Sequence, residues 1–323
     1  MEQTKNDLSV AVEDINTKLD QLSELNSSIA HEIFSNNDYD GVNYGPNDLL
    51  DQRNVILDDL SRYGDVQVTD LEDGKIQVKI NGKVVVDASG ASYTNDKLNI
   101  GSDGVTLTWN SNNQNANLGA GAIRGFTDML TGADPINAGI PYYQNKMDNF
   151  AQTLADVFNN KIHADDPDFP DKYKFLLQGG VDGKVTAGNI SISDQWADDV
   201  SYIIRKQNPD GELDNQDILD MKAAFEQDFN FGGEYTGTFS EFITSVTNTL
   251  GSGIKTNSAR MSASLAIAES ADSERMGVSG VSLNEEGISM MTYNKAYQAL
   301  GRLMTTMDEQ LDMIINKMGI VGR

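Results

Sequence analysis

The sequence contains no cysteine, and this absence excludes several kinds of site. Without thiols, the 323-residue chain forms no disulfide framework, no cysteine-ligated zinc site and no thiol nucleophile. Basic residues are scarce: 24 Lys and Arg stand against 49 Asp and Glu, which gives a net charge of −25. Proteins that bind duplex nucleic acid usually need a basic face, so the composition argues against a nucleic-acid partner.

Long apolar runs are absent as well. No stretch approaches the roughly 20 apolar residues that span a bilayer, so we expect no membrane partner. Met1 is followed by Glu2, Gln3 and Thr4 instead of a basic and then an apolar segment, so we expect no cleaved signal peptide. At about 150 residues per domain, the length predicts about two domains.

Histidine is scarce too. His31 precedes Glu32 as in a zinc-protease helix, but a second histidine four residues after the first is missing. The acidic segments Asp165–Asp168 and Asn208–Asp214 do not match an EF-hand loop. We therefore predict no metal, no cofactor and no catalytic residue.

Apolar residues at alternating spacings of three and four predict a long first helix. Its stripe consists of Leu8, Val12, Ile15, Leu19, Leu22, Asn26, Ile29 and Ile33. This period is typical of a coiled-coil seam, in which a polar residue such as Asn26 fixes register. It fits an ordinary amphipathic helix of a bundle equally well. A second helix is expected from about Asn47 to Gly64, with either Asn47 or Asp48 as its cap.

The period then changes to two, which predicts strands. The alternating runs are Val66–Val68, Ile76–Ile80, Val84–Val86, Leu98–Ile100 and Val105–Trp109. Asp73-Gly74 and Asn81-Gly82 are turn dipeptides, and Asn-Gly favours the tight turn that matches strand twist. We predict a β-meander within a small β-domain of residues 66–117.

Helical spacing returns at Tyr143–His163, and the glycines of Gly119–Gly125 predict a hinge before it. Residues 164–235 are acidic and show no single periodicity. Their sequence predicts a short strand at Ile190–Ile192 and short helices near Trp196–Arg205 and Asn215–Phe225. A long helix is expected over Phe239–Arg275. Gly251 and Gly253 would interrupt it, because each costs up to about 1 kcal/mol relative to Ala.

The last segment is the most regular. Its stripe consists of Leu283, Met290, Tyr293, Tyr297, Leu300, Met304, Met307, Leu311, Ile314 and Met318. Ser282 or Asn284 would cap this helix, and Glu285 and Glu286 suit its first turn. An isolated helix of this kind is marginally stable in water, so its stripe must find a partner. We predict an interaction helix in preference to a plain core helix.

These elements predict an α+β fold: a long-helix bundle completed by both chain ends, with a small inserted β-domain and a mixed α/β insert. The helical domain would comprise residues 1–65, 118–163 and 236–277. Residues 66–117 would form the β-domain, 164–235 the acidic insert and 278–323 a carboxy-terminal assembly helix.

Several segments resemble a known family. They are Pro46–Arg53, Gly121–Asp128 and Tyr143–Asp148, and, most specifically, Ser279–Glu286, Tyr293–Tyr297 and Met307–Asp312. In this order they are similar to the flagellar hook-associated protein 1 family, the hook-filament junction proteins of bacteria. Family members begin with an Asn-rich helical segment, and this chain is expected to lack that amino-terminal segment.

The resemblance implies a non-enzymatic structural protein of the bacterial flagellum. Such a protein would be extracellular, exported without a cleaved signal peptide, and would join hook to filament by helical self-assembly through its terminal coiled-coil helix. The implied partners are copies of itself, the hook protein, the next hook-associated junction protein and a flagellar export chaperone. Two alternatives stay open. One is a secreted hydrolase or binding module that uses residues 164–235; the other is a coiled-coil scaffold unrelated to flagella, paired through Leu8–Ile33.

Overall fold

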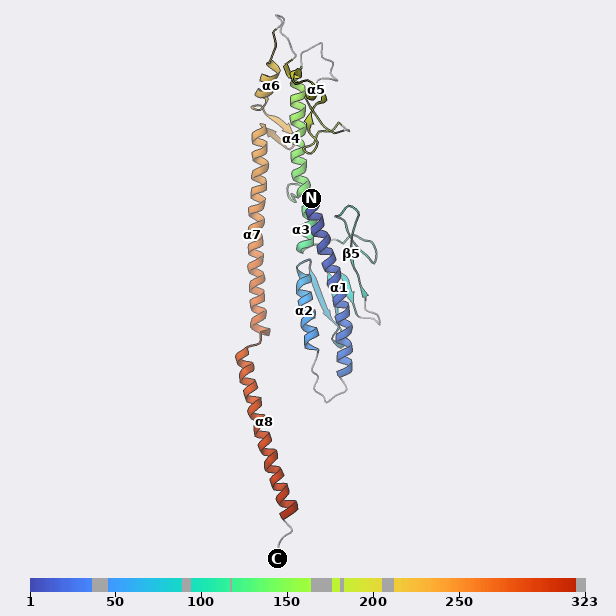
Figure 1. Ribbon diagram of the computed structural model, residues 1–323, viewed down its shortest axis with the longest axis vertical. Helices are drawn as coiled ribbons and strands as arrows, with labels where there is room; N and C mark the ends of the chain where they lie inside the picture. Colours follow the sequence, from blue (N-terminus) through green and yellow to red (C-terminus); the bar gives the residue numbers. More distant parts are fainter. Residues whose placement is uncertain are drawn as a thin grey trace, which may run out of the picture. The chain divides into compact units, whose positions relative to one another are not determined.

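A computed structural model describes residues 1–36, 46–88, 94–116, 118–163, 176–180, 183–204 and 212–317 (Figure 1). The chain divides into two units, Met1–Val246 and Thr247–Arg323. Asp165–Asp168, Met318 and most of Asn208–Asp214 lie outside the described residues. Long helices and small antiparallel sheets make up the rest, which confirms the predicted α+β class.

The first helix, α1 (Glu2–Asn36), is the central element of the first unit. It packs against α2 (Asn47–Ser61), α3 (Gly121–Thr131) and the neighbouring strands (Figure 1). The predicted stripe of α1 faces inward: Ile33 is half-buried and all its other members are buried. Leu60, Val78 and Ile123 share its apolar cluster, so the stripe forms the core of this part of the chain.

Two asparagines on α1 join the helix to strands through side-chain amides. Asn26 Nδ2 donates to the Ile76 carbonyl at 2.8 Å, and its Oδ1 accepts from the Ile76 N–H at 3.1 Å. Asn16 makes the same paired contact with the main chain of Leu98, at 2.9 and 2.8 Å. Each asparagine therefore fixes one point of α1 against a strand.

The predicted meander is confirmed. The strands β1 (Val66–Asp70), β2 (Ile76–Ile80), β3 (Lys83–Asp87) and β4 (Thr94–Asn95) form one antiparallel sheet in that order. A second antiparallel pair joins β5 (Leu98–Ile100) to β6 (Leu107–Trp109). Asn81 and Gly82 have φ values of 50° and 81°, as a tight turn of this type requires. The η1 turn (Glu72–Gly74) contains Asp73-Gly74.

The predicted hinge at Gly119–Gly125 is wrong, because α3 begins there. Gly121 has a φ of 79°, and a Cβ at this position would lie 2.3 Å from the main-chain carbon of Tyr63. The Ala122 N–H donates to the Arg62 carbonyl at 2.9 Å. Glycine thus allows the start of α3 to lie in close contact with the main chain that follows α2. This close contact, and not a hinge, explains why glycine occupies position 121.

The predicted side-chain cap of α2 is also wrong. Pro46 occupies the capping position, and its carbonyl accepts from the N–H groups of Leu49 and Leu50 at 3.0 Å each. Asn47 and Asp48 therefore lie within the first turn. Proline fits before a helix because it needs no partner for a main-chain N–H.

The rest of the first unit is built on α4 (Ile140–Lys161), which confirms the helix predicted at Tyr143–His163. The further elements are β7 (Leu177–Gln178), β8 (Ser191–Ile192), α5 (Asp194–Asp198), η3 (Val200–Ile204), α6 (Gln216–Ala224), β9 (Phe229–Phe231) and β10 (Tyr235–Gly237). The β9–β10 hairpin was not predicted. It places Phe231 on Phe242 with ring centroids 4.3 Å apart and contributes to an aromatic core with Phe150 and Phe239.

The second unit contains most of α7 (Phe239–Ser279) and all of α8 (Leu283–Asp312). The expected interruption of α7 is wrong, since Gly251 and Gly253 both lie inside continuous helix. In the part of the chain that the structure describes, we find no helix with the length and apolar content needed to cross a membrane.

Gly121 and Gly125 form a matched pair for testing the start of α3. We expect Gly121→Ala to lower the free energy of unfolding by at least about 1–2 kcal/mol, because alanine is strained at positive φ and would clash with Tyr63. Gly125 has no atom within 4 Å of its would-be Cβ, so Gly125→Ala should raise stability by up to about 1 kcal/mol. Urea unfolding followed by Trp109 fluorescence measures both, and equal effects would contradict the close contact.

The Asn26 contact is testable in the same assay. Asn26→Ala should cost about 2–4 kcal/mol, because it leaves the buried N–H and carbonyl of Ile76 without a partner. Ser27→Ala, at the exposed neighbouring position, is the control and should change stability by less than about 0.5 kcal/mol. A cost for Asn26→Ala no larger than that of the control would show that the paired contact does not stabilise the fold.

Candidate assembly helix

The start of α8 is set by local hydrogen bonds. The Gly280 N–H donates to the Met276 carbonyl at 2.8 Å and so closes α7. Ser282 Oγ then accepts from the Glu285 N–H at 3.4 Å, which confirms Ser282 as one of the two predicted caps. Glu285 and Glu286 lie in the first turn, where carboxylates interact favourably with the helix dipole. The helix then runs without a break to Asp312.

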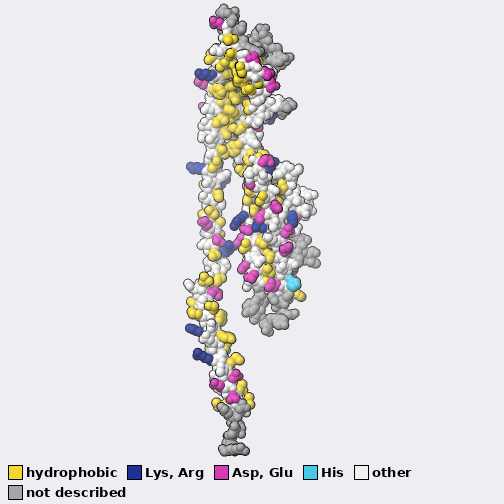
Figure 2. Space-filling view, viewed as in Figure 1, with side chains coloured by type: hydrophobic (Ala, Val, Ile, Leu, Met, Phe, Trp, Pro, Cys, Tyr) yellow, Lys and Arg dark blue, Asp and Glu magenta, His cyan; other side chains and the backbone are white. Residues whose placement is uncertain are grey.

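The apolar residues of α8 are exposed along its length. We define the α8 stripe as Leu283, Met290, Tyr293, Tyr297, Leu300, Met304, Met307, Leu311 and Ile314. The exposed fraction of these residues ranges from 50% at Leu311 to 87% at Leu283. Figure 2 shows apolar side chains along this helix, which Figure 1 draws in red. Met318, the last predicted member, lies outside the described residues.

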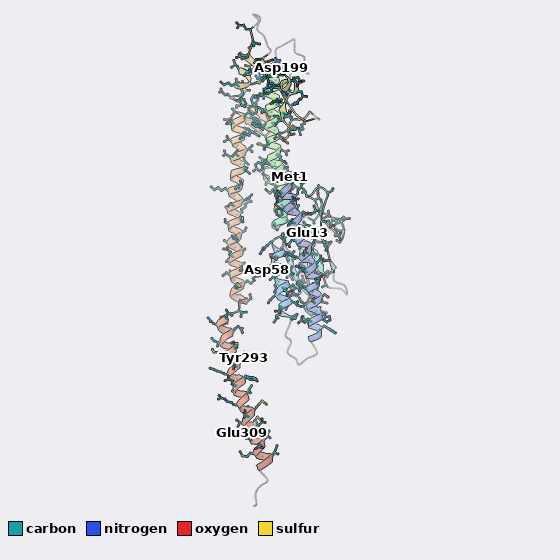
Figure 3. The ribbon with its side chains drawn as sticks, in the orientation of Figure 1. Met1, Glu13, Asp58, Asp199, Tyr293 and Glu309 are labelled. Carbon is teal, nitrogen blue, oxygen red and sulfur yellow. The ribbon has the colours of Figure 1, made fainter. Side chains whose placement is uncertain are left out.

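Polar side chains occupy the opposite side of α8. At 100° per residue, Lys295, Gln298, Arg302 and Glu309 lie across the helix from the α8 stripe. Tyr293 and Glu309, both labelled in Figure 3, represent the two faces. The helix is therefore amphipathic along most of its length, with an apolar face that the structure leaves in contact with solvent.

Apolar residues outside the strict spacing add to this surface. The sequence pattern missed Ile288, Met291, Leu303, Met313 and Ile315, which are all exposed. Leu303 widens the α8 stripe on one side, whereas Met291 lies on the polar face. A search for a wider apolar face, which also accepts residues next to the strict three-four positions, would have found Leu303. Met313–Lys317 continues as a single π-helical turn that no sequence signal predicted.

The part of α7 in the second unit is also exposed. Its apolar residues include Leu250, Ile254, Met261, Leu265 and Ile267, with exposed fractions from 42% to 74%. Serine, alanine and glycine fill many of the positions between them. The second unit therefore presents apolar side chains along two successive helices.

An exposed face of this size points to a partner. Burying one Leu, Met or Phe-sized side chain is worth about 1.5–3 kcal/mol, so covering even half of the α8 stripe is strongly favourable. Monomeric soluble proteins rarely leave contiguous apolar patches of more than a few hundred Å² in water, and larger patches mark interaction sites. The arrangement of α8 can therefore supply association.

The stripe of α1 has a different position. It has the same spacing as the α8 stripe, but its residues form the core with α2, α3 and the sheets. The structure thus supports the amphipathic-helix interpretation of Leu8–Ile33 over the coiled-coil one. A scaffold paired through this stripe would require the core to open.

The histidine at the end of α4 has a packing role. His163 is fully buried, its main-chain N–H donates to Asp217 Oδ2 at 2.8 Å, and its ring Nε2 lies 2.8 Å from the Tyr202 carbonyl oxygen. It thereby holds the end of α4 to η3 and α6. Ser193 is buried and caps α5 by accepting from the Trp196 N–H. Among the described residues, no group of three His, Asp or Glu side chains is placed to hold a metal ion.

Comparison with known proteins adds two family matches and one relative. Residues 1–171 match the model described as "Flagellar hook-associated protein FlgK helical domain". Residues 273–317, which include all of α8, match "Flagellar basal body rod FlgEFG protein C-terminal". The chain is similar to flagellar hook-associated protein 1 of Bacillus subtilis (strain 168), with 26% identity over 355 aligned positions that cover 99% of this chain and 67% of the relative.

The α1 stripe is buried and the α8 stripe is exposed, so replacing a leucine by alanine should reduce stability by different amounts in the two helices. Leu19→Ala, in the core, should lower the free energy of unfolding of the first unit by about 2–5 kcal/mol. Leu300→Ala, where the residue is 59% exposed, should change it by less than about 0.5 kcal/mol. Urea unfolding of the two variants at low protein concentration makes the comparison. A large cost for Leu300→Ala would show that α8 contributes to the folded core.

Proposed function

Because the chain belongs to the flagellar hook-associated protein family, whose helical-domain model matches more than half of it, we propose that it is a structural subunit joining hook to filament in the bacterial flagellum. The observation that carries the proposal is the exposed α8 stripe, which falls within the segment that matches the carboxy-terminal model of flagellar rod proteins. An amphipathic helix with an uncovered apolar face is what a subunit needs in order to assemble with its neighbours.

Assembly proceeds by helical association. When one face of a subunit contacts a different face of the next, the contact repeats and generates a ring or an open helical tube. The α8 stripe supplies one of these faces, and burial of its apolar side chains supplies the driving force. The polar face with Lys295, Arg302 and Glu309 stays hydrated or pairs with charges on neighbouring subunits. This role is structural and involves no catalysis.

The net charge supports the same role. A charge of −25 keeps unassembled copies apart, so that association requires the matched apolar surfaces. The absence of cysteine means that no disulfide obstructs an unfolded chain during export. The partners are further copies of the chain, the hook protein, the next hook-associated junction protein and an export chaperone, and the site of action is the extracellular part of the flagellum.

Charged substitutions on the two faces of α8 test this proposal. We expect the triple variant Leu300→Glu, Met304→Glu and Met307→Glu to reduce incorporation into flagella by at least about tenfold, because burying carboxylates in an apolar interface costs several kcal/mol. The variant is expressed in place of the native gene, and immunoblotting of isolated flagella measures incorporation. Swimming in soft agar provides a second readout.

The matched control adds the same charge to the polar face. Gln298→Glu, Thr305→Glu and Thr306→Glu also introduce three carboxylates into α8, at exposed positions away from the α8 stripe. This control should be incorporated at the wild-type level. Normal incorporation of the stripe variant, or equal loss in both variants, would overturn assembly through the α8 stripe.

A further inference from the structure

Methionine is concentrated on α8. The helix and the turn that follows it carry Met290, Met291, Met304, Met307 and Met313, out of 12 methionines in the sequence. Their exposed fractions range from 55% to 69%. By contrast, Met221 in the core of the insert is only 7% exposed. Solvent-borne reagents therefore have direct access to the thioethers of α8.

Three of these methionines lie on the assembly face. Met304 and Met307 are one turn apart in the α8 stripe, and Met290 lies on the same side of the helix near its start. Met291 and Met313 point away from the stripe, by the helical period. We refer to Met290, Met304 and Met307 as the stripe methionines.

We propose that the stripe methionines are a reversible oxidation site that controls assembly, with hydroperoxides as the oxidant. The inference rests on the proposed function, because it assumes that the α8 stripe becomes buried between subunits. One thioether reacts with one molecule of hydrogen peroxide: the O–O bond breaks, one oxygen is transferred to sulfur, and the other leaves as water. Sulfur is oxidised by two electrons and the peroxide is reduced by two.

The product no longer suits an apolar interface. A sulfoxide is polar and chiral, and its oxygen accepts hydrogen bonds from water that burial would remove. Methionine sulfoxides at Met304 and Met307 would lie beside Leu300 and Leu311 in the α8 stripe, so burial of the stripe would separate the sulfoxide oxygen from water. Oxidation thus opposes association at the place where thioethers favour it.

Two properties make the site a switch instead of simple damage. Methionine sulfoxide reductases restore the thioether, one enzyme for each sulfoxide epimer. Association buries the α8 stripe, so assembled subunits should react more slowly than unassembled ones. Sensitivity is therefore greatest in the subunit that has not yet been incorporated.

The test uses the purified full chain, treated with hydrogen peroxide. Peptide mass spectrometry measures sulfoxide at each methionine, and sedimentation velocity measures self-association as a function of concentration. We expect α8 methionines to be oxidised well before Met221. Oxidation should raise the concentration needed for association by at least about tenfold, and treatment with both reductases and dithiothreitol should restore it.

Two leucine variants assign the effect to the assembly face. The stripe variant carries Met290→Leu, Met304→Leu and Met307→Leu, and the control variant carries Met129→Leu, Met291→Leu and Met313→Leu. Leucine is close to methionine in volume and helix propensity, so both variants should associate normally before treatment. After peroxide, the stripe variant should keep its association and the control variant should lose it as the wild type does.

The outcomes separate this inference from the function on which it rests. If the untreated chain does not associate at any concentration tested, the proposed self-assembly fails and the inference fails with it. If the untreated chain associates and the oxidised chain associates equally well, the oxidation site alone is overturned. Loss of association in the oxidised stripe variant to the wild-type extent overturns it as well.

Discussion

The paired contact between Asn26 and the main chain of Ile76 determines where α1 lies against the sheet. Apolar side chains on either side of Asn26 can slide past one another at little cost, because hydrophobic burial is non-directional. The amide of Asn26, which both donates and accepts a hydrogen bond, cannot slide in this way. Any shift would leave buried polar groups without partners, and each such group costs about 1–3 kcal/mol of folding stability. The core with α2, α3 and the strands depends on α1 being held in this register, to which the Asn16 contact with Leu98 adds a second point.

Two helices of this chain have the same apolar spacing and opposite surroundings. The stripe of α1 is buried in its own unit, whereas the α8 stripe is exposed. Spacing shows that a helix needs a partner, because a three-four pattern produces a continuous apolar face on any helix. It does not show whether the partner belongs to the same chain. That distinction depends on long-range contacts such as Asn16 with Leu98, which are 82 residues apart in sequence.

Much of the fold followed from local signals. The long helices, the meander and the cap at Ser282 could be predicted because periodicity and turn dipeptides act over a few residues. One error arose where a distant contact decides: Gly121 permits close approach to Tyr63 and is no hinge. The β9–β10 hairpin is held by aromatic packing with α4 and α7, which no local pattern records. For the candidate site, the stripe residues and the preference for an interaction helix could be predicted, but the wider face at Leu303 could not.

The asparagine contacts also affect how copies of this chain meet at high concentration. The outward main-chain groups of a short strand can pair with a strand of another molecule, which leads to uncontrolled sheet growth. Asn16 occupies those groups at Leu98, and on α4 Asn159 bonds the N–H groups of Leu176 and Leu177 and the carbonyl of Leu177. Side chains of the same molecule thus cover strand groups that would otherwise be available to a neighbour. These contacts thereby reduce the number of strand groups at which β-aggregation between crowded molecules could start.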